Sequence, residues 1–370
     1  MVRASITAAL WHRKIPLKKP FVTALRCVDT VDDLVLKLSL GGYTGYGSAA
    51  PTVRITGDSA ETIADSVKHE LFPLFAADFD PRDPGGALRD AGDVSKSARY
   101  MAETALFDLA GSMQGLSLAD MLGGARRRVL TNDITISMGT PQEMARDAAD
   151  AAAQGFRNLK LKVGSDPETD YARLEAISRS VPDSVRLRVD ANQAWDAEEG
   201  IAILKEYKKA DFPIDFIEQP VPAEDIGGMA RLTEANIFPI AADESVFSAA
   251  DAERLMREKA AHIFNIKLAK CGGITEALAI CALAEDHNAR CMIGCMMEGP
   301  FGILAACQIA AARDPIHWID LDSPLLYRGL EGVFSVAFYN ERITVGNSPG
   351  IGIIDPALER WEGEKIWEAG

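Results

Sequence analysis

Eight short apolar runs alternate with helix-like stretches through the middle and end of this 370-residue chain. The runs are "NDITISM", "NLKLKV", "VRLRVD", "IDFIEQP", "FPIAADE", "HIFNIKL", "ARCMIGC" and "IHWIDLD". A strand–helix repeat of roughly 24 to 30 residues is typical of parallel βα units. Eight such units predict a compact (β/α)8 barrel. An open doubly wound sheet is the alternative, but no G-x-G-x-x-G opens any unit.

The segments on either side of these runs have a different texture. In residues 1–124, "DDLVLKLSLGGYTGYGSA" predicts a hairpin that turns at Gly-Gly, and helical spacing follows from about residue 58. We therefore expect an α+β capping domain over 1–124 and a (β/α)7β-type catalytic barrel over 125–322. The tail, 323–370, is rich in Gly and Pro and closes in a polar, helix-like stretch, and we expect it to return to the cap.

Composition limits the partners of this protein. The formal net charge of −15 makes nucleic acid and anionic membranes unfavourable partners. No apolar run reaches about 18 residues, and the first residues carry too many charges for a signal peptide. The six cysteines form no C-x-x-C pair and are expected to be buried free thiols. We expect a cytoplasmic protein without a membrane segment.

Nearly every apolar run ends in a charged or polar residue. In a barrel, the carboxyl ends of the strands meet at one mouth, so these residues would converge there. They are Lys160, Lys162, Asp190, Asn192, Glu218, Asp243, Glu244, Lys267, Lys270, Glu298, Asp320 and Asp322.

Three of these acids end consecutive strands. Asp190, Glu218 and Asp243 lie in "RVDANQ", "FIEQP" and "AADES". Hard oxygen ligands from neighbouring strands favour Mg²⁺, and the absence of His and Cys at these positions disfavours zinc. The alternative is that the three carboxylates only cap the helices that follow. Helix capping could explain one of these carboxylates, but not three that end consecutive strands.

The lysines lie on two sides of these acids. Lys162 ends the second strand and Lys267 the sixth, on roughly opposite sides of an eight-stranded ring. A metal between two bases fits removal of a proton next to a carboxylate, with an enolate as the intermediate. Return of a proton to the opposite face would give racemisation or epimerisation. Lys160 shares a strand face with Lys162, and adjacent ammonium groups lower each other's pKa. Lys270 is either a similar neighbour of Lys267 or a solvent-facing residue.

The motifs "LKLKVG", "DANQAW", "IEQPV", "ADESVF" and "FNIKLAKCGG" resemble the muconate lactonizing enzyme subgroup of the enolase superfamily. The resemblance covers essentially the whole chain. It implies Mg²⁺ on Asp190, Glu218 and Asp243, with Lys162 and Lys267 as the acid/base pair. Cycloisomerases, succinylbenzoate synthases and racemases share these motifs, so they do not fix the reaction.

The segment "WIDLDSP" narrows the reaction. Asp320 and Asp322 alternate, so both face the barrel mouth, where two carboxylates suit a substrate ammonium group. The pair is similar to the D-x-D motif of dipeptide epimerases, which implies binding of the dipeptide's α-ammonium group. A structural role in capping or in a surface ion pair is the alternative.

The side chains of the dipeptide are predicted from further resemblances. "KPFVTALRCVDT" and "APTVRITGDS" look closest to the L-Ala-D/L-Glu epimerases, which implies that Arg26 pairs with the glutamate side chain. Ser48 departs from the glutamate common in relatives, which leaves the specificity open. Lys160, Glu298 and Thr135 are further candidate substrate-binding residues. Asn192, Glu244 and Lys270 are candidates to support the metal ligands and bases.

The sequence thus predicts a Mg²⁺-dependent epimerase that inverts the C-terminal residue of an L,L-dipeptide, with L-Ala-L-Glu as the leading substrate. Alternatives are an N-acylamino acid racemase, a cycloisomerase of the same subgroup, or a non-catalytic barrel that binds a peptide or partner protein. We further expect a homo-oligomer and a role in murein peptide metabolism.

Overall fold

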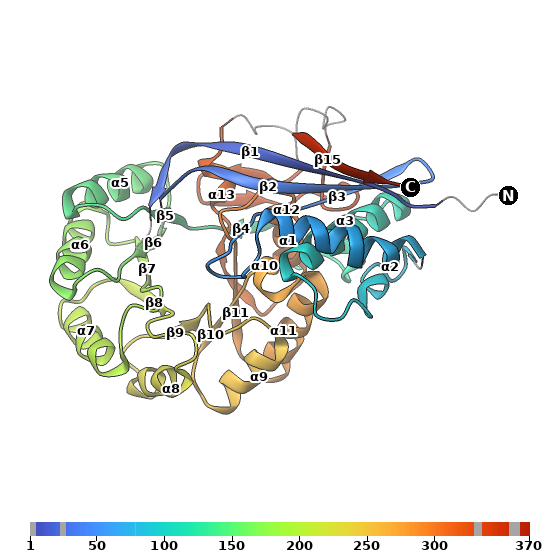
Figure 1. The fold of residues 1–370 in the computed structure, drawn as a ribbon. Coiled ribbons are helices and arrows are strands. Elements are labelled where there is room, and N and C mark those ends of the chain that lie inside the picture. Colours follow the sequence, from blue (N-terminus) through green and yellow to red (C-terminus); the bar gives the residue numbers. More distant parts are fainter. Residues whose placement is uncertain (1–4, 23–26, 78, 329–334, 355–362) are drawn as a thin grey trace.

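The computed structural model describes residues 5–22, 27–77, 79–328, 335–354 and 363–370. Within these ranges the chain forms an eight-stranded parallel barrel with an α+β unit packed against it (Figure 1). The prediction of a TIM-type barrel with an α+β cap is confirmed. In the same ranges, none of the helices is both long and apolar enough to cross a membrane.

The barrel strands follow one another in chain order around the ring. They are β5 (Ile134–Ile136), β6 (Asn158–Lys162), β7 (Arg186–Asp190), β8 (Ile214–Glu218), β9 (Ile240–Ala242), β10 (Ile263–Ile266), β11 (Arg290–Gly294) and β12 (Ile316–Asp320). Every neighbouring pair is parallel. Between β12 and β5 a single parallel bridge joins Asn132 to Ile319, so the barrel is nearly closed.

Helices surround the barrel and cover its outer face (Figure 1). They are α5 (Pro141–Ala153), α6 (Pro167–Ser180), α7 (Ala197–Lys209), α8 (Ile226–Ala235), α9 (Ala249–Arg257), α11 (Ile274–Asp286) and α12 (Pro300–Ala312). Two short helices, α10 (Leu268–Cys271) and α13 (Ser323–Leu326), contact the cap elements α3 and β1. Local sequence sets their starts. In α5, Thr140 and Glu143 form a capping box around Pro141, which satisfies the free N–H groups of the first turn.

The cap is an antiparallel sheet with helices on one face. Its strands are β1 (Thr7–Val22), β2 (Cys27–Leu40), β3 (Tyr43–Ala49) and β15 (Glu364–Ala369), in the order β15-β1-β2-β3. Its helical segments are α1 (Ala60–Asp65), the π-helix η1 (Ser66–Leu71), α2 (Phe72–Ala77), the 3₁₀ turn η2 (Gly86–Leu88), α3 (Lys96–Gln114) and α4 (Leu118–Met121). The predicted hairpin is present, because Gly41 and Gly42 both take positive φ between β2 and β3.

The cap is closely packed in itself and against the barrel. Within the cap, helix α3 lies so close to β3 that a Cβ at Gly47 would come within 2.0 Å of the Met101 carbonyl oxygen. Helix α12 of the barrel is buried along its whole length, since it packs against α3, β3 and α4 as well as the barrel. An α-helix that is apolar on all sides, as this one is, needs such cover.

The tail contains one departure from the predicted secondary structure. Residues Glu364–Ala369, expected in a polar helix-like stretch, form β15, which pairs antiparallel with β1. The prediction was wrong at this segment because the open edge of β1 offers hydrogen bonds that outweigh local helix propensity. Strands β13 (Ala337–Tyr339) and β14 (Arg342–Thr344) form a small sheet with β4 (Val129–Thr131).

Candidate active site

Three carboxylates meet at the carboxyl ends of β7, β8 and β9, and we call them the acidic triad. Asp190 and Glu218 are the last residues of their strands, and Asp243 directly follows β9. Parallel pairing sets Asp190 beside Glu218 in register. All three side chains are buried, and one oxygen from each lies within 4.8 Å of the others.

The chemistry of this triad fits a hard divalent cation. Each member offers a carboxylate oxygen, and the group contains no His or Cys. Oxygen donors alone are the set that Mg²⁺ prefers. A hydrogen bond of 2.8 Å from the Asn265 amide to Glu218 Oε1 orients one of the three carboxylates, as supporting groups do at metal centres.

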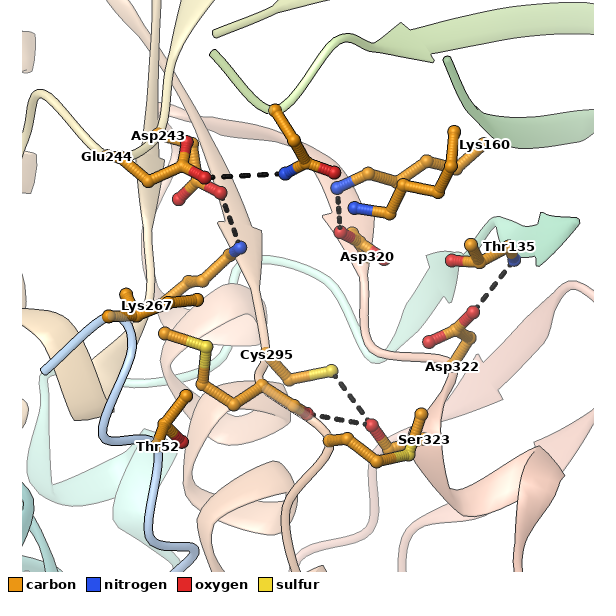
Figure 2. Close-up of a pocket in the computed structure, with 15 residues that line it drawn as sticks. Thr52, Thr135, Lys160, Asp243, Glu244, Lys267, Cys295, Asp320, Asp322 and Ser323 are labelled. Atoms are coloured by element: carbon orange, nitrogen blue, oxygen red, sulfur yellow. Dashed lines mark hydrogen bonds and ion pairs between the residues drawn. The ribbon is translucent and has the colours of Figure 1, made fainter. Parts of the chain in front are cut away.

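A lysine pairs with each end of the acidic triad. Lys162, the last residue of β6, places Nζ 2.5 Å from Asp190 Oδ2. Lys267, directly after β10, places Nζ 2.6 Å from Asp243 Oδ2 (Figure 2). Both lysines line the cavity at the barrel mouth. Strands β6 and β10 lie four positions apart in the sheet, so the two ammonium groups approach the cavity from different sides.

Lys160 lies among carboxylates. Its Nζ is 2.8 Å from Asp320 Oδ2, 2.8 Å from Glu218 Oε2 and 3.2 Å from Asp190 Oδ2. Although burial opposes the charge, these carboxylates, Asp320 foremost, raise the pKa of Lys160 well above its usual value. Lys160 is therefore a permanent cation that joins the acidic triad to the Asp320 side of the site.

Lys270 is buried and does not face solvent. Its Nζ lies 2.5 Å from Asp243 Oδ1, donates to the Asp243 carbonyl, and donates to the Asn265 carbonyl at 3.1 Å. Burial is the main cause that lowers the pKa of Lys270, and the Lys267 ammonium adds to it. The sequence left open whether Lys270 is a neighbour of Lys267 or a solvent-facing residue. The structure supports the first alternative.

The lysines shift the pKa values within the acidic triad in different directions. Burial opposes ionisation of all three acids, but Lys267 and Lys270 hold the pKa of Asp243 well below its usual value. Lys162 and Lys160 likewise lower that of Asp190 despite its burial. Burial and the neighbouring Asp190 raise the pKa of Glu218 to about 7. Such pKa shifts in opposite directions are expected for several carboxylates that share one buried site with lysines.

Asp320 and Asp322 lie on the opposite wall of the cavity. Asp320 ends β12 and contacts Lys160, while Asp322 Oδ2 accepts a hydrogen bond of 2.8 Å from the Thr135 N–H (Figure 2). Burial, together with Asp320, raises the pKa of Asp322 to about 6. Both carboxylates line the cavity, as Thr135 does, so the structure brings these candidates together.

Asn192 and Glu244 also line the cavity, beside the acidic triad. The Asn192 side-chain amide donates to Glu244 Oε1 at 3.3 Å, and the Asn192 backbone N–H donates to Asp190 Oδ1 at 2.9 Å. Burial and Asp243 raise the pKa of Glu244. Asn192 therefore contacts both Asp190, a member of the acidic triad, and Glu244.

Two further candidates come from the specificity arguments. Arg26 is outside the described residues. Glu298 is not among the described residues that line the cavity. Its oxygens accept hydrogen bonds from the Tyr100 hydroxyl and the Met296 N–H. Burial raises the pKa of Glu298 to about 7. Ser48 is buried in β3 of the cap.

The rest of the cavity wall was not singled out from the sequence. It comprises Thr52, Ile55, Cys295, Met296, Met297 and Ser323. The first two come from the cap, and the others from segments after β11 and β12. The sequence segments that contain them could be matched to those of relatives. The residue types themselves do not indicate a catalytic or binding role.

Two family models match the chain. Residues 5–123 match the mandelate racemase / muconate lactonizing enzyme N-terminal domain, and residues 143–355 match the enolase C-terminal domain-like model.

Individual relatives are similar over nearly the whole chain. An L-Ala-D/L-Glu epimerase of Clostridium acetobutylicum is 41% identical, with 92% of this chain and 96% of the relative covered. The substrate-liganded L-Ala-D/L-Glu epimerase from Bacillus subtilis superposes with a TM-score of 0.89 at 37% identity, with 94% and 98% of the two chains covered. A dipeptide epimerase from Enterococcus faecalis, complexed with Mg and L-Leu-L-Tyr, gives 0.89 at 33% identity, with 95% and 100% covered.

Proposed function

Because this chain belongs to the mandelate racemase / muconate lactonizing enzyme family of the enolase superfamily, we propose that it is a Mg²⁺-dependent dipeptide epimerase with L-Ala-L-Glu as its leading substrate. The single observation that carries this proposal is the arrangement of one cavity. It places two lysines beside the acidic triad and a carboxylate pair on the opposite wall.

Asp190, Glu218 and Asp243 would hold the Mg²⁺. When bound, the ion would stabilise negative charge that develops on the substrate carboxylate as the adjacent α-proton leaves. Lys160, Asn192 and Asn265 keep these carboxylates in place through the contacts described above. Lys270 supports Asp243 from the side away from the cavity.

Lys162 and Lys267 are the proposed acid/base pair. One Nζ removes the α-proton of the C-terminal residue, and the other delivers a proton to the opposite face, which inverts that carbon. The support for two bases is their position, since each pairs with a different member of the acidic triad and both reach the cavity.

Asp320 and Asp322 are the proposed partners of the dipeptide ammonium group. Among the described residues, Lys160 is the one ammonium group within contact distance of Asp320, and it also contacts Asp190 and Glu218. Because its charge is shared among three carboxylates, a second cation suits this wall. An N-acylamino acid or a muconate brings no ammonium group, so these two buried carboxylates would keep only Lys160 and the Thr135 N–H as partners, which disfavours those two alternatives.

The side-chain preference rests on the relatives. Both L-Ala-D/L-Glu epimerases and a dipeptide epimerase that binds L-Leu-L-Tyr are similar to this chain. We take L-Ala-L-Glu as the leading substrate and Arg26 as the partner of its glutamate side chain. Glu298 is reassigned from substrate contact to a supporting role.

The wider setting is also a proposal. We divide the chain into a cap over 1–124, a barrel over 125–322 and a tail over 323–370. Four buried free cysteines and the acidic surface fit a reducing cytoplasm. We further propose a homo-oligomer and a role in murein peptide metabolism.

A panel of dipeptides in D₂O tests the proposed function. The purified protein is incubated with Mg²⁺ and L-Ala-X dipeptides, together with N-acetylamino acids as substrates that lack an ammonium group. Deuterium at the C-terminal α-carbon, read as a mass increase, identifies the substrates. We expect uptake and epimerisation for free dipeptides, L-Ala-L-Glu above all. Uptake confined to N-acetylamino acids would point to a racemase, and none anywhere to a binding barrel.

A further inference from the structure

We propose that Glu298 and Tyr100 are positioning residues that fix the cavity wall formed by Cys295, Met296 and Met297, and so set which dipeptide side chains the enzyme accepts. We name these three residues the sulfur wall. The inference rests on the proposed function for its substrates, but its structural part does not.

The sulfur wall has hydrogen bonds at both ends of its central residue. The Met296 N–H donates to Glu298 Oε1 at 2.9 Å, and the Met296 carbonyl accepts from the Ser323 hydroxyl at 2.9 Å. The Cys295 thiol lies 3.2 Å from the same hydroxyl (Figure 2). The segment lies between β11 and α12, outside both elements, so these side-chain contacts replace the regular backbone hydrogen bonds of a helix or strand.

Glu298 connects this wall to the cap. Its other oxygen, Oε2, accepts a hydrogen bond of 2.9 Å from the hydroxyl of Tyr100 on α3. Both side chains are buried. A carboxylate with both oxygens engaged in this way is held in one orientation, and its two partners belong to different parts of the molecule.

The surrounding packing leaves little room for this contact to shift. A Cβ at Gly302 would lie 1.4 Å from the Tyr100 hydroxyl oxygen, and one at Gly299 would lie 2.0 Å from Asp33 Oδ2. Asp33, on β2, accepts from the Gly299 N–H at 3.2 Å and pairs with Arg13 at 3.1 Å. The cap is therefore joined to the residues just after the sulfur wall at two points, Tyr100 and Asp33.

The consequence concerns selectivity. Cys295, Met296 and Met297 line the cavity together with Thr52 and Ile55 of the cap. Because Glu298 fixes one side of this wall relative to the cap, the space between the two is set by the Tyr100–Glu298 hydrogen bond. Loss of that bond would change binding of the dipeptide side chains more than the chemistry at the lysines.

Three variants separate this role from a general one. Tyr100→Phe removes only the hydroxyl, and Glu298→Ala removes both hydrogen bonds. Glu298→Gln keeps the shape, since its amide oxygen can accept from Met296 and its amide nitrogen can donate to Tyr100. Tyr207→Phe is the matched control, because the Tyr207 hydroxyl is buried without a hydrogen-bond partner among the described residues.

The first readout is independent of activity. Hydrogen exchange by mass spectrometry follows the peptide that contains Met296, whose N–H donates to Glu298. One hydrogen bond is worth about a five-fold change in an equilibrium. We expect about five-fold faster exchange confined to this peptide in Tyr100→Phe and a larger increase there in Glu298→Ala, which loses both hydrogen bonds. Rates in Glu298→Gln and Tyr207→Phe should stay close to the parent. Unchanged exchange, or acceleration spread over the whole chain, would overturn the inference.

The second readout is kinetic. KM and kcat are measured for L-Ala-L-Glu and L-Ala-L-Leu, and we expect Tyr100→Phe to raise KM about five-fold, unequally for the two, with a smaller change in kcat. Equal losses in kcat at constant KM would contradict a selectivity role. If the parent protein epimerises no dipeptide, the proposed function fails, and the exchange experiment alone decides this inference.

Discussion

Replacing Asp322 by Asn removes a negative charge from the proposed ammonium site while preserving its shape. The Asn oxygen can still accept the hydrogen bond that Thr135 N–H gives to Asp322 Oδ2 at 2.8 Å. Asp320 is left in place, because its contact with Lys160 would otherwise change as well. The variant therefore tests the charge of one carboxylate.

The expected loss follows from the burial of that carboxylate. Asp322 is only 4% exposed, so its bond to a substrate ammonium group is poorly screened by water. A hydrogen bond to a charged group contributes about 1.5–3 kcal/mol, which corresponds to a rise in KM of roughly 10- to 150-fold. The α-proton transfer takes place at the lysines, so kcat should fall much less.

The same group predicts a pH dependence. The pKa of Asp322 is raised to about 6, and only the ionised form binds an ammonium group well. The KM of the parent enzyme should therefore rise as pH falls through about 6, and the KM of Asp322→Asn should not show this rise. Below that pH the two proteins should converge.

The assay is the initial rate of α-proton exchange for L-Ala-L-Glu, followed by ¹H NMR in D₂O across a pH series. Asp183→Asn, at an exposed position, is the control. A KM for Asp322→Asn within about two-fold of the parent at pH 8 would refute the ammonium assignment. An equal rise in KM in the control would also contradict it.

Two further predictions concern stability. Chelation of divalent cations with EDTA should abolish exchange of the substrate α-proton. Mg²⁺ at about 100 times its Kd should raise the free energy of unfolding by about 2.7 kcal/mol, measured by calorimetry. No thermal shift on addition of Mg²⁺ would argue against a metal at the acidic triad. Asp133→Ala should cost about 3–5 kcal/mol in urea unfolding, because buried Arg188, whose Nη1 lies 2.6 Å from Asp133 Oδ2, loses its carboxylate partner. Glu175→Ala, which breaks an exposed pair with Arg179, should cost less than about 1 kcal/mol, and equal losses would contradict the account.

The barrel could be predicted because the alternation of apolar runs and helical stretches is a local property of the chain. Once eight parallel strands close into a ring, their carboxyl ends meet at one mouth. The acids and lysines at those ends could therefore be assigned to one site without knowledge of side-chain packing. This is why Asp190, Glu218 and Lys267, far apart in sequence, were found together.

What the sequence did not predict depends on contacts between distant segments. Lys270 could be solvent-facing or buried on periodicity alone, and the Asp243 carbonyl that it contacts decides between them. Glu298 carries a charge at a strand end, yet its orientation is set by Tyr100, 198 residues earlier in the chain. The sulfur wall consists of residue types that are ordinary in any core. Strand β15 exists because β1 offers a free edge.

The most direct test of the two-base account replaces each catalytic candidate in turn. Lys162→Ala and Lys267→Ala remove the amines, and Lys162→Arg keeps a cation beside Asp190 that does not lose its proton. Lys209→Ala is the control, because that side chain is 80% exposed.

The measurement is α-proton exchange in D₂O from L-Ala-L-Glu and, separately, from L-Ala-D-Glu, with Mg²⁺ present. The account predicts that no lysine variant epimerises the dipeptide, while each Ala variant exchanges the α-proton of one epimer only, and the two variants act on opposite epimers. Lys162→Arg should behave as Lys162→Ala does. Undiminished epimerisation by either Ala variant, or exchange of the same epimer by both, would contradict it.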